Sequence, residues 1–159
     1  MNVRKQHAAI AVLLVMMVFV GTMAYAGGEN NDIGRHRWCG FCGMDRKAYG
    51  FSRMLIRYED GTDVGVCSLH CAVIELDANR GHGIKALLVA DRETRTLIDA
   101  EKASWVIGGS KRGVMTQRPK WAFPSKAAAE AFIAEYGGKI VTWAEALAAA
   151  REELDRERR

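Results

Sequence analysis

The residues with the clearest chemistry are sulfur donors in the segment Cys39-Gly-Phe-Cys42-Gly-Met44. Its two thiols and one thioether lie within six residues, and soft donors of this kind suit monovalent copper. A glycine follows each cysteine, so the backbone can turn tightly enough for the sulfur atoms to converge. The thioether adds a neutral donor that does not form disulfides. This spacing therefore predicts a metal site before any other function.

A second pair of cysteines, Cys67 and Cys71, follows after 24 intervening residues. Four thiolates in two close pairs can form a closed tetrahedral zinc site. In an exported protein the same four residues can instead form disulfides, with three possible pairings. Cys71 is expected in the first turn of a helix, where the positive helix end lowers a thiol pKa and favours the metal-binding thiolate. Zinc binding and disulfide formation both stay open at this point.

Met115 ends a loop rich in glycine and positive charge that begins at Gly108. One interpretation is that its side chain covers an edge of the core, since methionine fills irregular gaps. The other is that the loop folds over and delivers a third soft ligand to the metal site. His36 and His70 flank the two cysteine pairs and are weaker candidates, because imidazole is a common metal donor.

The pair Cys39 and Cys42, preceded by Trp38, is also similar to the redox motif of thioredoxin-like enzymes. Such an enzyme needs a helix that starts at the first cysteine and a cis-proline opposite the pair. Here Gly43-Met44-Asp45 is a poor helix start, and the two prolines of the chain lie far downstream. A thiol-disulfide oxidoreductase that uses Cys39 and Cys42 is therefore the alternative function, not the leading one.

The N-terminal segment has the pattern of a secretory signal. Residues 1–26 begin with two basic side chains, continue as an apolar run and end in Ala-Tyr-Ala, so we expect cleavage before Gly27 and a periplasmic protein. No cysteine adjoins the cleavage point, so a lipid anchor is not supported. Residues 27–37 are rich in glycine, asparagine and charge and predict a flexible leader. Removing residues 1–26 lowers the net charge from +4 to +2, which is too weak to favour nucleic acid.

Patterns of strand, turn and helix recur in the two halves of the remaining chain. Residues 51–58 alternate apolar and polar side chains, and a turn through Asp60-Gly61-Thr62 returns the chain into a strand at 63–67. Ser68 is a good N-cap for a helix that ends at Gly81, and residues 84–91 form a third strand.

The second half repeats this order. Its strands are expected at 95–98, 105–107, 121–123 and 139–141, with a helix between the last two. Residues 143–159 are good helix formers. We therefore predict an α+β fold of two small ββαβ lobes, at about 38–92 and 93–143, followed by a C-terminal helix at 144–159.

Taken together, these motifs resemble the NosL family of accessory proteins for nitrous-oxide reductase maturation. The likeness runs from about Trp38 to Trp143. It is carried by the Cys39–Met44 motif, Asp60-Gly61-Thr62 before Cys67-Ser68, the glycine-rich loop ending at Met115, and Phe123-Pro124. The resemblance implies two ββαβ lobes similar to organomercurial lyase and a periplasmic Cu(I) chaperone with Cys42, Met44 and Met115 as ligands.

This chain departs from the resemblance in two respects. Family members are commonly lipoproteins, whereas no cysteine stands at this signal's end, and Cys71 is an additional thiol. Our leading hypothesis is a non-enzymatic protein that holds Cu(I) through sulfur and passes it to a copper-receiving protein. That partner would be nitrous-oxide reductase or its membrane maturation complex. A structural zinc module built from Cys39, Cys42, Cys67 and Cys71 is the remaining alternative, so Zn(II) at the cysteine pairs stays open.

Overall fold

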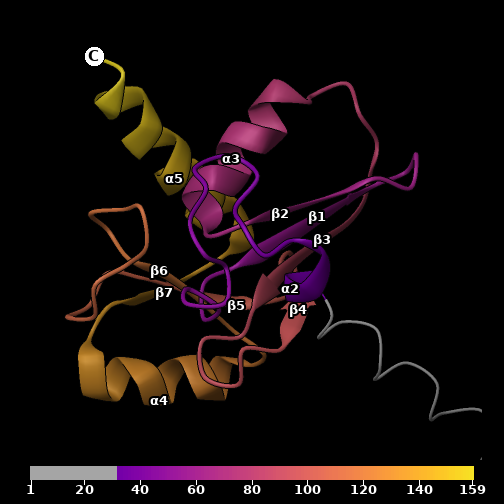
Figure 1. The fold of residues 1–159 in the computed structure, drawn as a ribbon. Coiled ribbons are helices and arrows are strands. Elements are labelled where there is room, and N and C mark those ends of the chain that lie inside the picture. The colour runs from indigo at the N-terminus through magenta and orange to yellow at the C-terminus, as the bar shows by residue number, and fades with distance from the viewer. Residues whose placement is uncertain (1–31) are drawn as a thin grey trace, which may run out of the picture.

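The computed structural model describes residues 32–159, which form an α+β fold with two antiparallel sheets and a C-terminal helix (Figure 1). The fold class predicted from the sequence is thereby confirmed. The predicted signal peptide and residues 27–31 of the leader lie outside the described residues. Within residues 32–159, no helix is both long enough and apolar enough to span a lipid bilayer.

The first sheet has the strand order β2-β1-β3-β4. Its strands are β1 (Met54–Tyr58), β2 (Asp63–Val66), β3 (Ile84–Ala90) and β4 (Leu97–Asp99), and α3 (Leu69–Ala78) connects β2 to β3. The turn between β1 and β2 forms because Asp60 Oδ1 accepts hydrogen bonds from the Thr62 amide and hydroxyl, at 2.9 and 2.7 Å. Gly61 supplies the positive φ of 89° that this turn requires.

The second sheet has the strand order β6-β5-β7. It contains β5 (Ser104–Ile107), β6 (Lys120–Phe123) and β7 (Lys139–Val141), with α4 (Lys126–Tyr136) between β6 and β7. Ser125 caps α4 by accepting a hydrogen bond from the Ala128 amide, and Gly137 ends it with a φ of 73°. Each half of the chain therefore contains the expected strand–strand–helix–strand order.

The strand at β4 differs from the sequence-based expectation, which counted residues 95–98 in the second lobe. β4 pairs with β3 and extends the first sheet past residue 92. The chain returns through a tight turn in which the Asp91 amide donates to the Thr96 carbonyl, at 2.8 Å. Leu97 then packs with Leu55 and Leu88 on one face of the first sheet, and this burial fixes the pairing.

The C-terminal helix α5 (Trp143–Glu157) begins with a capping box formed by Thr142 and Glu145. It packs against α3 and β5 through its buried residues Ala146, Ala150 and Leu154. The two halves share a core, because the largest cluster of buried side chains contains residues of both sheets and of α5.

The two sheets are also joined directly. Asp91, at the end of β3, forms a parallel bridge with Ala122 of β6. The Arg92 guanidinium lies over the neighbouring rings of Phe51 and Trp121, 5.1 and 5.2 Å from their centroids. The lobes are therefore held together by packing and by backbone contact.

The prediction of a flexible leader is wrong for residues 32–37. Asp32 begins a short helix, α2 (Asp32–Arg35), and its carboxylate is buried. It forms ion pairs with Arg46 and Arg53 at 2.7 and 3.0 Å. The charge that indicated a solvated segment is thus neutralised inside the protein, and it anchors residues 32–37 to the first lobe.

Candidate metal centre

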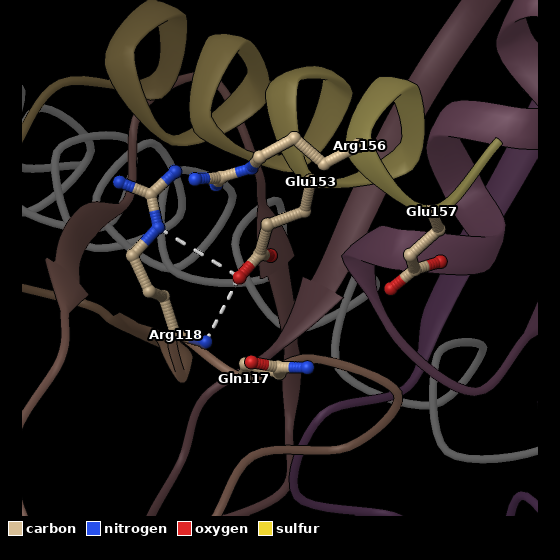
Figure 2. Close-up of a pocket in the computed structure, with 5 residues that line it drawn as sticks. All are labelled: Gln117, Arg118, Glu153, Arg156 and Glu157. Atoms are coloured by element: carbon tan, nitrogen blue, oxygen red, sulfur yellow. Dashed lines mark hydrogen bonds and ion pairs between the residues drawn. The ribbon is translucent and has the colours of Figure 1, made fainter. Parts of the chain in front are cut away.

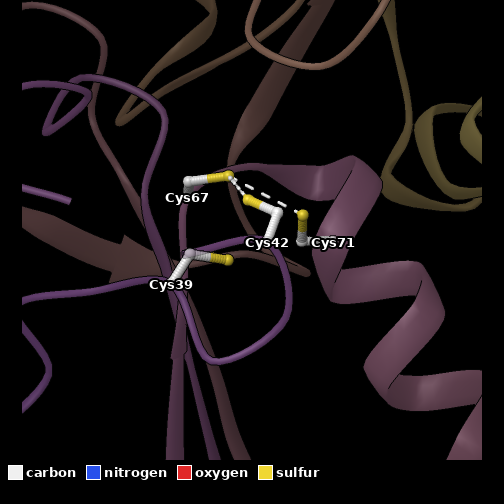
Figure 3. A group of neighbouring side chains, drawn as sticks. All are labelled: Cys39, Cys42, Cys67 and Cys71. Atoms are coloured by element: carbon white, nitrogen blue, oxygen red, sulfur yellow. Dashed lines mark hydrogen bonds between the residues drawn. The ribbon is translucent and has the colours of Figure 1, made fainter. Parts of the chain in front are cut away.

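Four cysteine side chains converge at one end of the first sheet (Figure 3). Cys39 and Cys42 come from the loop that precedes β1, Cys67 directly follows β2, and Cys71 lies in the first turn of α3. Their four Sγ atoms all lie within 4.8 Å of one another. Two cysteine pairs that are distant in the sequence therefore form a single group, called the thiol cluster below.

The loop from Cys39 to Met44 is closed by its own backbone. The Gly43 amide donates to the Cys39 carbonyl at 3.0 Å, and the Cys39 amide donates to the Met44 carbonyl at 2.8 Å. Gly43 adopts a φ of 73°, which a side chain would strain. The Gly40 amide donates to the Gly65 carbonyl of β2 at 3.0 Å, so the loop is fixed beside the strand that leads to Cys67.

Arg46 ties the same two segments together from inside the protein. Its Nε donates to the Val66 carbonyl, directly before Cys67, at 3.1 Å, and its amide donates to the Arg37 carbonyl at 2.9 Å. The guanidinium also pairs with Asp32 and is fully buried. A Cβ at Gly65 would lie 2.6 Å from Arg46 Cζ, so only glycine permits this close approach.

The sulfur separations suit one metal ion. The Sγ atom of Cys67 lies 3.5 Å from that of Cys42 and 3.7 Å from that of Cys71. These distances are far longer than a disulfide bond of about 2.05 Å, and all four cysteines are free thiols in this structure. Zn–S bonds of about 2.3 Å in a tetrahedron imply S–S edges of roughly 3.8 Å. These two separations therefore match the edge of a four-thiolate metal site, and the remaining ones are within 4.8 Å.

The pKa values of the thiols are shifted in different directions. Hydrogen bonds from Cys67 and Cys71 lower the pKa of Cys39 well below its usual value. The hydrogen bond to Cys39 correspondingly raises the pKa of Cys67 to about 12 and also raises the pKa of Cys71. This direction is opposite to the lowered pKa expected for Cys71 from its place at the start of a helix, because hydrogen bonding with Cys39 and Cys67, together with burial, outweighs the helix end.

The other predicted donors differ in where they lie. Met44 is half-buried against the core that contains Cys39 and Cys67. Met115 lies in the loop between β5 and β6, and 41% of its surface is exposed. His36 Nε2 is 2.7 Å from Asp63 Oδ1, so its ring is engaged in an ion pair or hydrogen bond.

The charged residues that hold these segments in place, above all Arg46 and Asp32, could not be identified from the sequence. Arg46 follows the cysteine motif by only four residues, but arginine at such a position is ordinarily solvated. Its burial depends on Asp32, which lies in a segment of flexible composition. No local pattern links the two residues.

An α+β fold that brings four thiols together defines a candidate metal-binding protein. The profile of the NosL family matches residues 30–150, which is most of the chain, and the protein therefore belongs to the NosL family. Among solved structures, it is similar to the crystal structure of the copper chaperone NosL from Shewanella denitrificans. The two share 26% sequence identity with a TM-score of 0.55, over 68% of this chain and 87% of that one. No curated protein sequence matches the chain significantly.

Proposed function

We propose that this protein is a metallochaperone that holds Cu(I) through the thiol cluster and passes it to a partner protein. The observation that carries the proposal is the convergence of four free Sγ atoms within 4.8 Å in a chain of the NosL family. Thiolate and thioether sulfur are the donors that favour Cu(I) over harder divalent ions. The resemblance noted from the sequence and the related copper chaperone support copper as the cargo and a non-enzymatic role.

The unequal burial of the four thiols supports transfer of the ion by ligand exchange. Cys39, Cys67 and Cys71 are buried, whereas Cys42 is half-exposed. A donor on an approaching protein can therefore reach the ion from the Cys42 side and replace one sulfur at a time. We propose nitrous-oxide reductase, or the membrane complex that matures it, as the source of that donor.

A structural zinc site is the second candidate, and the sulfur separations favour it. Distances of 3.5 and 3.7 Å are close to the edge of a tetrahedral four-thiolate zinc site. A thiol oxidoreductase has less support. Cys39 is buried and the Cys42 sulfur is within hydrogen-bonding distance of Cys67, so Cys39 and Cys42 form part of a four-thiol group and not a separate redox pair.

The reduced protein is expected to bind about one Cu(I) tightly and Cu(II) weakly, because the thiol cluster contains no imidazole or carboxylate. Competition with a chromogenic Cu(I) chelator measures this, and parallel competition with a zinc indicator separates the two candidates. Retention of Zn(II) by four thiolates without retention of Cu(I) would replace the chaperone proposal with the structural one.

We also propose that the protein acts in the periplasm after removal of residues 1–26. The exported product is expected to begin at Gly27 and to carry no lipid, because Ala24 and Ala26 suit a signal-peptidase site. Intact-mass measurement on protein from the periplasmic fraction tests this. A mass that includes residues 1–26 or an acyl chain would contradict it.

A further inference from the structure

The loop that carries Met115 is held by a buried carboxylate of the C-terminal helix. Glu153 of α5 accepts hydrogen bonds from the Thr116 hydroxyl at 2.6 Å and from the Arg118 amide at 2.9 Å, and it forms an ion pair with Lys120. Figure 2 shows Glu153 extending from α5 toward Arg118. The side chains of Glu153 and Lys120 are only 8% and 3% exposed. A charged network therefore fixes the residues that follow Met115.

The loop adopts a conformation that its sequence would not favour without support. Met115 has a φ of 54°, in the left-handed region that a non-glycine residue rarely occupies. A Cβ at Gly113 would lie 2.5 Å from Thr116 Cγ2 and 3.0 Å from Pro119 Cα, so the turn is also closely packed. Backbone strain of this kind persists only where surrounding contacts impose it. The contacts that impose it on the C-terminal side of Met115 are those of Thr116 and Arg118 with Glu153.

The residues on either side of Met115 lie near the start of α3. Val114 is buried in the same core as Cys39, Cys67 and Cys71, while Met115 itself is partly exposed. A small cavity is lined by residues of this loop and by residues between Cys67 and Cys71, including Val114, Thr116, Ser68, Leu69 and His70. The loop therefore lies against the beginning of α3, beside the second cysteine pair.

From this geometry we infer that Glu153, paired with Lys120, is a positioning residue that holds the Met115 loop against the start of α3, so that the Met115 thioether is available to an ion in the thiol cluster. The inference rests on the proposed function and adds to it a residue that positions one of the sulfur donors. A buried ion pair contributes little net stability compared with apolar packing. It does fix geometry, because the Glu153 carboxylate must meet the Thr116 hydroxyl, the Arg118 amide and the Lys120 ammonium together. Met115 is thereby presented as a sulfur that an ion meets on entering or leaving the cluster.

A double-mutant cycle between Glu153→Gln and Met115→Leu tests this inference. Met115→Leu keeps the side-chain volume and removes the sulfur. Glu153→Gln is expected to weaken Cu(I) binding by about tenfold in the otherwise unchanged protein, in the range found for residues that orient metal ligands. In the Met115→Leu background it should weaken binding by less than about twofold, because there is no thioether left to position.

Two further variants separate positioning from general destabilisation. Thr116→Val removes one hydrogen bond to Glu153 without leaving a buried charge, and it should reproduce the coupling to Met115 even if Glu153→Gln folds poorly. Glu152→Gln is the matched control on the same helix. Glu152 is 59% exposed and pairs with Arg118 at the surface, so its replacement should leave Cu(I) affinity unchanged.

The methyl resonance of Met115 in the metal-free protein supplies a readout independent of copper. We expect one sharp signal in the unchanged protein and a shifted or broadened signal in Thr116→Val. Equal losses of affinity in both Met115 backgrounds, or no loss in either, would overturn the positioning role while leaving the chaperone proposal intact. Failure of the unchanged protein to retain Cu(I) would instead overturn the chaperone proposal itself.

Discussion

Cys67→Ser is expected to weaken metal binding by about two to three orders of magnitude. Cys67 has the closest sulfur neighbours in the thiol cluster, at 3.5 Å from Cys42 and 3.7 Å from Cys71. Structural zinc sites with four ligands bind their ion with about 10–16 kcal/mol, an average of roughly 2.5–4 kcal/mol for each ligand, and a serine hydroxyl is a poor substitute for a thiolate. Chelator competition with the reduced variant measures the loss.

The metal-free fold should tolerate the same substitution. A serine hydroxyl can retain the hydrogen bonds of the Cys67 thiol, so the free energy of unfolding should fall by only about 1 kcal/mol. Ser52→Ala is the control, because it changes a nearby buried serine whose hydroxyl bonds to backbone carbonyls and not to a sulfur. A large drop in melting temperature with unchanged metal affinity would assign Cys67 a structural role instead.

Asp32→Asn is expected to lower the free energy of unfolding by about 3–5 kcal/mol, because it leaves the buried guanidinium groups of Arg46 and Arg53 without their counter-charge. Asp99→Asn is the matched control. Asp99 pairs with Lys102 at the surface, where an ion pair contributes about 0–1 kcal/mol. Urea denaturation of both variants checks this, and equal effects would contradict it.

The same carboxylate predicts how stability depends on pH. Burial raises the pKa of Asp32, but hydrogen bonds and charge from Arg53 and Arg46 outweigh burial and hold this pKa below its usual 3.8. The unfolded chain therefore takes up the proton at a higher pH than the folded protein. The contribution of Asp32 is complete above about pH 4 and is lost as the pH falls through the lower folded pKa. Asp32→Asn should remove this part of the acid sensitivity.

Local patterns predicted most of the fold. The β1–β2 hairpin depends on the Asp60-Gly61 turn, and α4 depends on its Ser125 cap and Gly137 stop, so neighbouring residues determine these elements. The partner of β4 could not be predicted in the same way. Leu97 suits either sheet as an apolar residue, and only its packing against Leu55 and Leu88 selects the first.

The candidate site was predicted in parts rather than as a whole. The spacing within each cysteine pair indicated metal binding, but the meeting of the pairs depends on the contact between Gly40 and Gly65 and on buried Arg46. The pKa values of the thiols could not be predicted either, because the pKa of Cys71 depends on hydrogen bonding with Cys39, 32 positions earlier. Such long-range electrostatic coupling leaves no local signature.

The shared core of the two halves limits how this protein can be divided. The lobes repeat the same order of elements, yet the thiol cluster belongs to one and the Met115 loop to the other, and a common interior joins them. A half excised on its own would expose apolar surface that now contacts the other half, and it would separate Phe51 from Trp121, whose rings both contact Arg92. The cysteine motif is therefore not a portable module, and grafting it elsewhere would require the opposing lobe as well.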